Sequence, residues 1–532
     1  MMKKDTSYTI KRVQRLPVIL IGEGLLVGVV GGLVVLLYRV ALTYAARWLG
    51  EILVFIKGDP LRVAGWFLIL ALFAVIVGKL VRWEPMISGS GIPQVEGDIQ
   101  GKLSQDWRRV LPAKFFGGFL CLLGGLSLGR EGPSIQLGAM SGQGVSRMLD
   151  RGKTEERYLM TCGASAGLSA AFHAPLAGVM FAFEEIHKGF SVGLMVSVMT
   201  ASVTADYICS YIMGLDPVFL FKLEHVLPQN YYWMLLLLGV ILGVLGVFYN
   251  KVMLKAQELY KKPKVLNETT RLLIAFLAAG VMGLVMPSVL GSGGDLITEL
   301  TEGRMVLTLV AVTFVVKFLF SAVSFGSGAP GGIFFPLLVL GALIGGVFAL
   351  TGVELFGLDP VYVNNFVLLS MAGFFTAIVR APITGIILLF EMSGSVSQML
   401  SLALVSVAAY ITATLMGSEP IYESLLGKIL AGKNGDGKGS GKESTRASSA
   451  AGSQKVLSEF VIMGGSVLEG RTVMEINWPK NCLLVALARD GKEMIPRGKT
   501  KLMAGDKLTV LTDERDAGYI HDKMENLCYT SF

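Results

Sequence analysis

The sequence places an arginine and a glutamate side by side within strongly apolar sequence. They lie in the stretch Gly129-Arg130-Glu131-Gly132-Pro133, which follows the apolar run 122–128. Charged side chains at membrane depth are costly and usually face a protein interior or a water-filled path. Because glycine frees the backbone and proline suits the first turn of a helix, the stretch predicts a helix that begins inside the membrane beside an ion pathway. A short charged loop between two spans is the alternative.

Three further clusters contain groups that can donate hydrogen bonds to an anion. The hydroxyls of Ser90 and Tyr422 are two such donors, and the backbone N–H groups of Ile333 and Phe334 are two more. Donors without a full counter-charge can hold an anion and still let it leave, as transport requires. Taken singly, each cluster also fits a turn or a helix cap. The clusters are Ser88-Gly89-Ser90-Gly91-Ile92-Pro93, Gly331-Gly332-Ile333-Phe334-Phe335-Pro336 and Glu419-Pro420-Ile421-Tyr422-Glu423.

The composition is that of a membrane protein with many spans. Of the 532 residues, 53% are hydrophobic and only 16% are charged, whereas about a quarter of the residues in globular chains are charged. The net charge of +7 comes from basic residues beside apolar segments, as the positive-inside rule predicts, so nucleic acid is not indicated. The sequence has no metal-ligand cluster, catalytic triad or phosphate-binding loop, and therefore predicts neither an enzyme nor a cofactor.

Both ends of the membrane part are predicted to lie in the cytoplasm, because Lys3 and Lys4 precede it and Lys433 and Lys438 follow it. The first span is predicted near residues 17–48. Several later apolar segments are shorter than the roughly 20 residues of a complete span, and many begin at glycine or proline. Broken helices are tolerated at membrane depth only where they are buried or line a cavity, so this pattern predicts a transporter or channel core.

The chain contains an internal repeat, because three landmarks of its first half return in the same order in its second half. Repeated halves with interrupted helices place a substrate site near the bilayer midplane, between the halves. In the landmarks, Gly89-Ser90-Gly91 corresponds to Gly291-Ser292-Gly293, the stretch 129–133 to the run 328–336, and Ala174-Pro175-Leu176-Ala177-Gly178 to Ala381-Pro382-Ile383-Thr384-Gly385.

The repeat separates two neighbouring glutamates. Glu184 aligns with Glu391, which indicates a shared structural feature, whereas Glu185 aligns with Met392 and has no counterpart. A carboxyl group that the repeat does not require is the better functional candidate. A solvated position at a helix end is the alternative for Glu185.

The composition changes after the apolar part. We expect residues 1–431 to form a transmembrane domain and residues 432–454, rich in Gly, Ser and Lys, to form a flexible linker. Residues 455–532 predict a small cytoplasmic α/β domain. Its expected elements are strands near 455–463, 483–488 and 507–511, a turn at 489–491 and a short helix near 516–526.

Together the motifs resemble those of the CLC family of chloride channels and chloride/proton antiporters. The resemblance covers roughly residues 15–430. It implies an all-α polytopic membrane protein with inverted repeats and broken helices, assembled as a homodimer with one anion pathway in each subunit. Gly89-Ser90-Gly91-Ile92-Pro93, Gly129-Arg130-Glu131-Gly132-Pro133 and Gly332-Ile333-Phe334-Phe335-Pro336 match the family's three selectivity-filter motifs, and Pro420-Ile421-Tyr422 matches the segment of its filter tyrosine.

The resemblance implies how chloride would be bound. The hydroxyls of Ser90 and Tyr422 and the backbone N–H groups of Ile333 and Phe334 would coordinate the ion. Fluoride-exporting relatives typically alter the serine of the first motif and the residue after the gating glycine. Here Ser90 and Pro133 are the chloride-type residues.

The resemblance also implies two proton-handling carboxyl groups. Glu131 would be the gating glutamate, which blocks an anion position when ionised and swings away when protonated. Glu185 matches the family's internal proton-transfer glutamate, which channel members usually lack. Its presence favours an antiporter that exchanges two chloride ions for one proton.

The C-terminal part resembles the TrkA-C type of domain, the C-terminal module of potassium-conductance regulators. Such modules bind small ligands or dimerise, which implies regulation from the cytoplasm by an unidentified small ligand. A passive assembly domain is the alternative. The matching residues are Gly465-Ser466, Leu468-Glu469-Gly470-Arg471-Thr472, Arg489-Asp490-Gly491, Ile495-Pro496 and Ala504-Gly505-Asp506-Lys507-Leu508.

Three hypotheses follow for the whole chain. The leading one is a proton-coupled chloride antiporter of the cell membrane, and the second is a passive, voltage-gated chloride channel. A reversal potential that responds to a proton gradient separates the two. The third is a ligand-sensing receptor with an inert membrane part, and anion flux retained after deletion of residues 432–532 would count against it.

Overall fold

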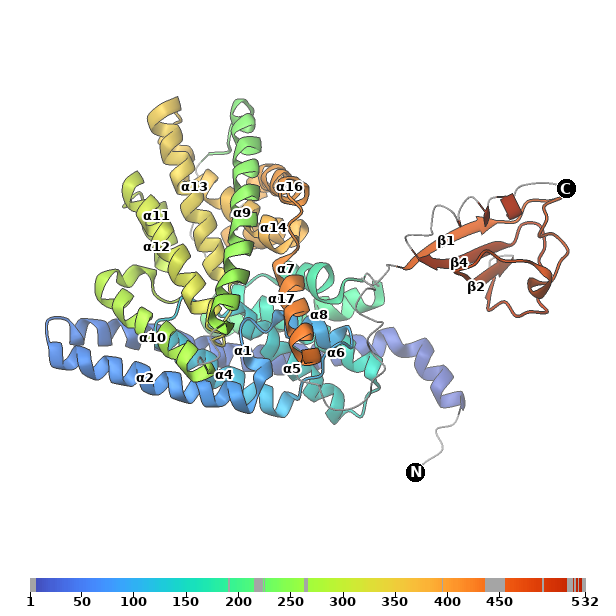
Figure 1. Cartoon of the computed structure of the whole chain (residues 1–532), viewed down its shortest axis with the longest axis horizontal. Helices are drawn as coiled ribbons and strands as arrows, with labels where there is room; N and C mark the ends of the chain where they lie inside the picture. Colours follow the sequence, from blue (N-terminus) through green and yellow to red (C-terminus); the bar gives the residue numbers. More distant parts are fainter. Residues whose placement is uncertain are drawn as a thin grey trace. The chain divides into compact units, whose positions relative to one another are not determined.

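The computed structural model divides the chain into two compact units, residues 1–436 and 437–532, and each is described by itself (Figure 1). The structure describes residues 6–189, 192–214, 223, 225–262, 267–394, 396–435, 455–489, 492–513, 520, 523–524 and 526–528. Most of the predicted linker and part of the predicted turn, residues 490–491, lie outside these ranges.

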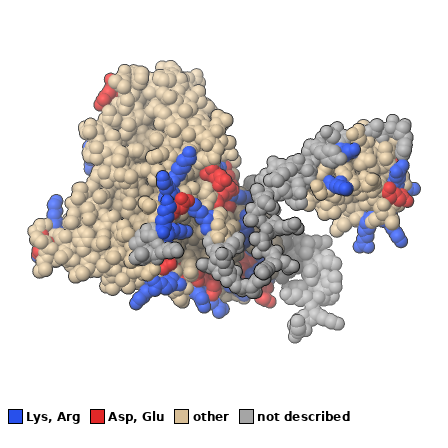
Figure 2. Space-filling model, viewed as in Figure 1, with Lys and Arg blue, Asp and Glu red and all other residues tan. Residues whose placement is uncertain are grey.

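The first unit is entirely helical within the described residues, and eight of its helices are long and apolar enough to cross a membrane. The visible face of this unit in Figure 2 is mostly uncharged. Most of its acidic and basic side chains lie near the centre and along the lower edge of the view, and a few lie at the left and at the top. The helices are α1 (Thr6–Ile56), α2 (Pro60–Trp83), α3 (Ile92–Ile99), α4 (Trp107–Leu123), α5 (Glu131–Met148), α6 (Lys153–Phe172), α7 (Pro175–Phe181), α8 (Val192–Met213), α9 (Tyr232–Lys261), α10 (Glu268–Val285), α11 (Gly294–Thr301), α12 (Leu307–Gly326), α13 (Phe334–Phe356), α14 (Val363–Val379), α15 (Pro382–Ser393), α16 (Met399–Leu415) and α17 (Ile421–Gly435).

The first helix is longer than the sequence predicts. The expected span near 17–48 continues as helix to Ile56. The reason is that residues 49–56 contain no proline and no helix-ending glycine cap, and the turn comes only at Gly58, which has φ 88°. Asp59 then caps α2 by accepting hydrogen bonds from the N–H groups of Leu61 and Arg62.

The helices repeat in order, with α9–α16 following the same sequence as α1–α8. Helix α5 packs on α6 as α13 packs on α14, and α1 packs on α8 as α9 packs on α16. The broken helices are confirmed. Helices α3 and α11 have only eight residues each, and each begins after a glycine in the left-handed region, Gly91 at φ 96° and Gly293 at φ 84°.

The two halves are joined by reciprocal helix caps. The Glu184 carboxylate accepts hydrogen bonds from the N–H groups at the start of α15, with 2.8 Å to Thr384 N. In return, the Glu391 carboxylate accepts from the start of α7, with 2.7 Å to Ala177 N. Reciprocal contacts of this kind are those of a two-fold relation between halves. The contacts explain why both halves carry this glutamate, as the sequence analysis expected of a shared structural feature.

Close helix contact depends on glycine where α5 crosses α6. A Cβ atom added to Gly138 would collide with the carbonyl oxygen of Gly163, and one added to Gly163 would collide with that of Gly138. Small residues allow this approach in a membrane, where packing replaces the hydrophobic effect as the force between helices. The contact holds the start of α5, and therefore Glu131, against α6.

The second unit is a four-stranded antiparallel sheet in the order β1-β4-β2-β3. Its strands are β1 (Lys455–Val461), β2 (Cys482–Arg489), β3 (Lys492–Met494) and β4 (Lys507–Asp513). The three predicted strands correspond to β1, β2 and β4, but β3 was not predicted because it has only three residues. Helical residues between Ile520 and Cys528 correspond to the predicted C-terminal helix, although part of that range is not described.

Candidate anion and proton site

The three predicted motifs meet through backbone hydrogen bonds. Gly129 and Gly332 exchange two of them, with N···O distances of 2.7 and 2.8 Å. Gly89 donates to the Gly328 carbonyl over 3.2 Å and accepts from the Gly331 N–H over 3.0 Å. The first and second motifs are thus both tied to the third, although more than two hundred residues separate Gly89 from it. These backbone hydrogen bonds bring three stretches that are distant in the sequence to one place.

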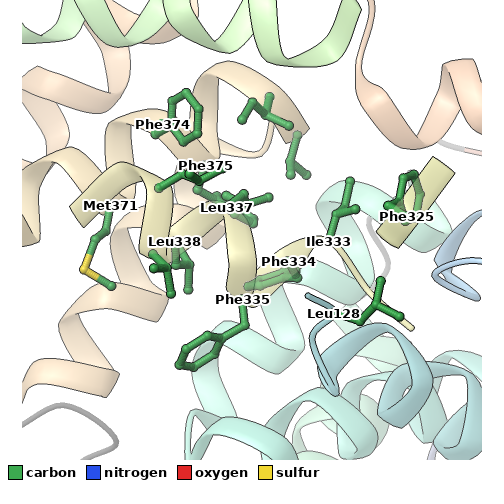
Figure 3. Packing of buried hydrophobic residues seen from close by; sticks show 14 of the residues in the cluster. Leu128, Phe325, Ile333, Phe334, Phe335, Leu337, Leu338, Met371, Phe374 and Phe375 are labelled. Atoms are coloured by element: carbon green, nitrogen blue, oxygen red, sulfur yellow. The ribbon is translucent and has the colours of Figure 1, made fainter. Parts of the chain in front are cut away.

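Helices α5 and α13 both begin at this junction, at Glu131 and Phe334. The N-cap residues, Arg130 and Ile333, make no side-chain hydrogen bond to the first turn. The free N–H groups and the positive ends of two helix dipoles therefore lie at the same place, where they favour an anion. Figure 3 shows Ile333 and Phe334 at the start of α13, with Leu128 of the second motif segment nearby.

The Phe334 ring is enclosed by aromatic side chains from three other helices. Ring centroids lie 4.8 Å away for Phe375, 5.3 Å for Phe172 and 6.0 Å for Phe181. Figure 3 shows the contact between Phe334 and Phe375. This packing fixes the first turn of α13 and hence the direction of its N–H groups.

Polar atoms without an ordinary hydrogen bond surround the junction. The hydroxyls of Ser90 and Tyr422 lie close enough to interact with each other. Neither these hydroxyls nor the carboxylate oxygens of Glu131 make a hydrogen bond of ordinary geometry among the described residues. Glu131 and Tyr422 are fully buried and Ser90 is 2% exposed. Leaving a buried polar group unsatisfied costs about 1–3 kcal/mol, so groups of this kind require an explanation. For the two hydroxyls, a ligand that accepts hydrogen bonds fits this chemistry. An ionised carboxylate can only accept, so the Glu131 oxygens call instead for a proton or for N–H donors.

The Glu131 carboxylate lies beside the start of α13. Its nearest cation is Arg130, with 3.9 Å between Nε and Oε1. The backbone N–H groups of Phe335 and of Glu131 itself lie close enough to the carboxylate to interact with it. A Cβ atom at Gly129 would collide with Oε2, and one at Gly132 would lie 2.5 Å from the Ser90 hydroxyl. The glycines of the second motif therefore leave room for the carboxylate and for Ser90.

Glu185 lies apart from this junction, on a π-helical turn (Ala182–His187) that follows α7. It is 3% exposed, and its Oε1 has no partner among the described residues. The solvated position considered as an alternative is therefore wrong. Tyr422 connects the two regions, because the charges of both Glu185 and Glu131 act on its hydroxyl.

A lysine close to Glu185 in the sequence, to which sequence reasoning gave no role of its own, organises the surroundings of Glu185. Lys188 lies 2.8 Å from the carboxylate of Glu96 on α3, and it also forms an ion pair with Glu423 on α17. It adopts a left-handed backbone conformation, with φ 51°. Lys188 therefore links the turn that carries Glu185 to the helix of the first motif and to the helix of Tyr422.

Two buried lysines, missed from the sequence, support the glycine loops. Lys114 on α4 donates hydrogen bonds to the carbonyls of Ile87 and Gly89, over 2.9 and 2.7 Å. Lys317 on α12 makes the equivalent bonds in the second half, over 2.8 Å to Val289 and 2.9 Å to Gly291. The available signal was a lysine in the middle of an apolar helix at nearly the same distance from each glycine motif, 25 residues after Gly89 and 26 after Gly291.

Two cavities approach the junction. One, of about 310 Å³, reaches Ser90 and is lined by three basic residues, Lys261, Arg271 and Lys428. The other, of about 590 Å³, reaches Arg130 and is lined also by the glycine loop 291–294. Glu131 lines neither of these two cavities.

Comparison with known proteins agrees with this geometry. The family model described as voltage gated chloride channel matches residues 73–414, and the TrkA-C domain model matches residues 457–524. The H(+)/Cl(-) exchange transporter ClcA of Vibrio vulnificus strain YJ016 is 36% identical over 413 residues, which are 76% of this chain and 88% of that protein. The ClcA protein of Vibrio cholerae strain O395 is 37% identical over 441 residues, with coverages of 81% and 93%.

Solved structures show the same architecture. A slow cyanobacterial Cl-/H+ antiporter superposes with a TM-score of 0.74 at 29% identity and covers 78% of this chain and 99% of its own. A CLC-type fluoride/proton antiporter superposes with a TM-score of 0.63 at 23% identity over 76% of this chain and 97% of its own, which shows the shared fold alone.

The fold and the site define a multi-pass membrane transport protein, not an enzyme. The chain belongs to the voltage-gated chloride channel (CLC) family and carries a C-terminal TrkA-C domain.

Proposed function

We propose that this protein exchanges chloride for protons, two chloride ions for each proton, across the cell membrane. The observation that carries the proposal is the group of buried hydroxyl and carboxylate oxygens without ordinary hydrogen bonds at the point where α5 and α13 begin. The Vibrio relatives are H(+)/Cl(-) exchange transporters, and this supports the choice of ions.

In the proposed mechanism, chloride is held without a buried counter-charge. The hydroxyls of Ser90 and Tyr422 and the N–H groups of Ile333 and Phe334 donate to it. The nearby lysine, Lys114, is occupied by two carbonyls and therefore does not trap the ion. Binding by dipoles alone allows the ion to leave.

Two carboxyl groups handle the proton. When ionised, Glu131 occupies an anion position beside the start of α13 and closes the path. When protonated, it loses the attraction to the helix end and swings away. Glu185 passes protons between Glu131 and the cytoplasm, with Tyr422 between the two carboxyl groups.

We further propose a homodimer with one pathway in each subunit and both termini in the cytoplasm. Residues 1–431 form the transport domain, 432–454 the linker and 455–532 a TrkA-C domain that regulates transport in response to a small ligand. The basic lining of the Ser90 cavity supports a cytoplasmic position for that mouth.

Purified protein in liposomes, with chloride and pH recorded together, tests the proposal. We expect chloride movement to drive protons against their gradient, and Glu131→Gln and Glu185→Gln to abolish proton movement. A reversal potential that follows chloride alone in the unmodified protein would make the protein a passive channel. Anion flux retained after deletion of residues 432–532 would count against the receptor hypothesis, whereas absence of anion flux in the unmodified protein would support it.

A further inference from the structure

A second group of ionisable side chains lies outside the proposed pathway, between α1, α6 and α8. Arg39 is 8% exposed, and the side chains of His173 and Asp206 are 10% and 20% exposed. Ionisable residues inside a membrane domain are costly and by default indicate a function. The proposed mechanism uses none of these three.

The hydrogen bonds of this group fix the tautomer of the histidine. Arg39 Nη1 lies 2.7 Å from His173 Nε2 and also donates to the Ala170 carbonyl over 2.9 Å. An arginine can only donate, so Nε2 must accept and carries no proton. The other ring nitrogen, Nδ1, lies 3.2 Å from Asp206 Oδ1 and 3.2 Å from the Ser210 hydroxyl. These contacts therefore place the ring hydrogen of His173 on Nδ1, where it can be donated to Asp206.

A proton added to His173 would change these contacts. It would bind at Nε2 and place two donors, both positively charged, against each other, so the bond to Arg39 would be lost. The Asp206 carboxylate on the other side of the ring would stabilise the imidazolium. The group therefore has two arrangements that differ by one proton.

The repeat shows that the fold accepts a cation at this position. His173 and Arg380 end α6 and α14 in the left-handed region, with φ 53° and 72°, and each is followed by Ala-Pro. Arg380 donates to the Tyr410 carbonyl over 2.7 Å and to the Ser418 carbonyl over 2.9 Å. The second half thus carries a permanent cation where the first half carries a titratable one.

The group is connected to the gate through two routes. Phe172, directly before His173, stacks on Phe335 at 6.2 Å and packs on Phe334. The second route runs from Arg39 on α1 to Arg130, because the charges of these two arginines act on each other. Arg130 in turn is paired with the Glu131 carboxylate. The other charged or titratable groups that act here are Glu391 of α15, which interacts with Asp206, and Cys209 of α8.

The group lies far from Glu185 along α6. Thr161 of α6 is 3.3 Å from His187, two residues after Glu185. His173 is a further twelve residues along the chain, or about 18 Å at 1.5 Å per residue. On α1, Leu42 and Thr43 line the cavity that reaches Arg130, and they follow Arg39 by three and four residues. The group therefore lies near that cavity, which is on the outer side in the proposed orientation.

We propose that His173, Arg39 and Asp206 form a proton-binding site separate from the two transport glutamates, and that its occupancy sets how readily outside protons open the Glu131 gate. The binding of the proton stands on the geometry alone. The effect on the gate rests on the proposed function.

Nitrogen NMR of ¹⁵N-histidine-labelled full-length protein tests the site itself. The chain has four histidines, and His173→Asn identifies the signal of His173, while His225→Asn, at an exposed position, is the matched control. We expect a neutral ring with its hydrogen on Nδ1 that becomes cationic on acidification. A hydrogen on Nε2, or no titration between pH 4 and 9, would overturn the site.

Two variants move the titration midpoint of His173 in opposite directions. Asp206→Asn removes the anion that stabilises the imidazolium, so the midpoint should fall by about one pH unit or more. Arg39→Met removes the facing cation, so the midpoint should rise. A shift of the same sign in both variants would contradict the arrangement, and either variant alone gives a test if the other does not fold.

Chloride flux at varied outside pH tests the connection to the gate. A cationic His173 favours ionised Glu131, so the outside-pH midpoint of flux should move to higher pH in His173→Asn, on the order of half a pH unit for one nearby charge. His225→Asn should leave it unchanged. If NMR shows titration but flux is unaltered in His173→Asn, the regulatory role fails while the site stands. If no variant transports protons at all, the proposed function fails instead.

Discussion

Replacing Lys114 by methionine should weaken chloride binding, and replacing Lys317 in the same way should not. Both lysines are fully buried and each donates to two carbonyls of a glycine loop. The loop held by Lys114 continues into Ser90, whereas the loop held by Lys317 carries no proposed chloride donor. The second lysine is therefore a matched control within the same chain.

The expected sizes follow from the contacts. Each variant leaves two carbonyls without a donor but removes a buried ammonium group, so the free energy of unfolding should fall by about 1–3 kcal/mol in both. Only Lys114→Met also removes the bond to the Gly89 carbonyl, which fixes the orientation of the Ser90 hydroxyl toward the proposed chloride position. A hydrogen bond to a charged group contributes about 1.5–3 kcal/mol, so the Kd for chloride should rise by at least about tenfold.

Calorimetry of chloride binding in detergent, with thermal unfolding of the same samples, gives both quantities. In Lys317→Met the Kd should change by less than about twofold although the loss of stability is similar. An equal rise of Kd in the two variants would mean that the effect is general loosening of the fold. An unchanged Kd in a folded Lys114→Met protein would show that Lys114 does not position Ser90.

Three further outcomes are expected. Glu391→Ala removes the charged cap of α7 and should lower the free energy of unfolding by about 1–2 kcal/mol in denaturant titrations. Gly138→Ala should reduce the monodisperse fraction in size-exclusion chromatography, because its Cβ collides with the backbone of Gly163. Burial opposes the charged form of Asp506, but hydrogen bonds from Arg489 and a backbone N–H outweigh it and hold the pKa of Asp506 below its usual range. Its stabilising effect on residues 437–532 is therefore present above about pH 4 and is lost as the pH falls through the folded-state value, and Asp506→Asn should flatten that dependence in thermal unfolding followed by circular dichroism.

The sequence allowed parts of the candidate site to be predicted where neighbouring residues alone carry the necessary chemical groups. The stretch 129–133 contains its own glycines, charge and proline, and the local rules for helix starts apply directly to it. The same holds for the separation of Glu184 from Glu185, because comparison of the two halves needs no coordinates. The structure then shows the reason, a helix cap for the first and an enclosed carboxyl group for the second.

The remaining parts depend on contacts between distant residues. In the sequence, Lys114 is an isolated charge in an apolar helix with no visible partner. The structure shows that its ammonium group donates to the carbonyls of Ile87 and Gly89. The partners of Lys188 come from two other helices, α3 and α17. The end of α1 was missed because residues 49–56 carry no stop signal, and β3 was missed because three residues show no alternation.

The proposed proton-binding residues lie where the two halves differ. The halves share the glycine loops, the buried lysines and the reciprocal glutamate caps, and these shared parts build the frame. At the start of the paired helices α5 and α13, the first half has Glu131 where the second has Phe334. Glu185 stands opposite Met392, and His173 stands opposite Arg380. Because a symmetric frame gives both halves the same backbone, each of these replacements adds a proton-binding group to a position that the fold already supports. An anion path needs only the shared helix ends, so we infer that the proton chemistry was added on one side of the repeat alone.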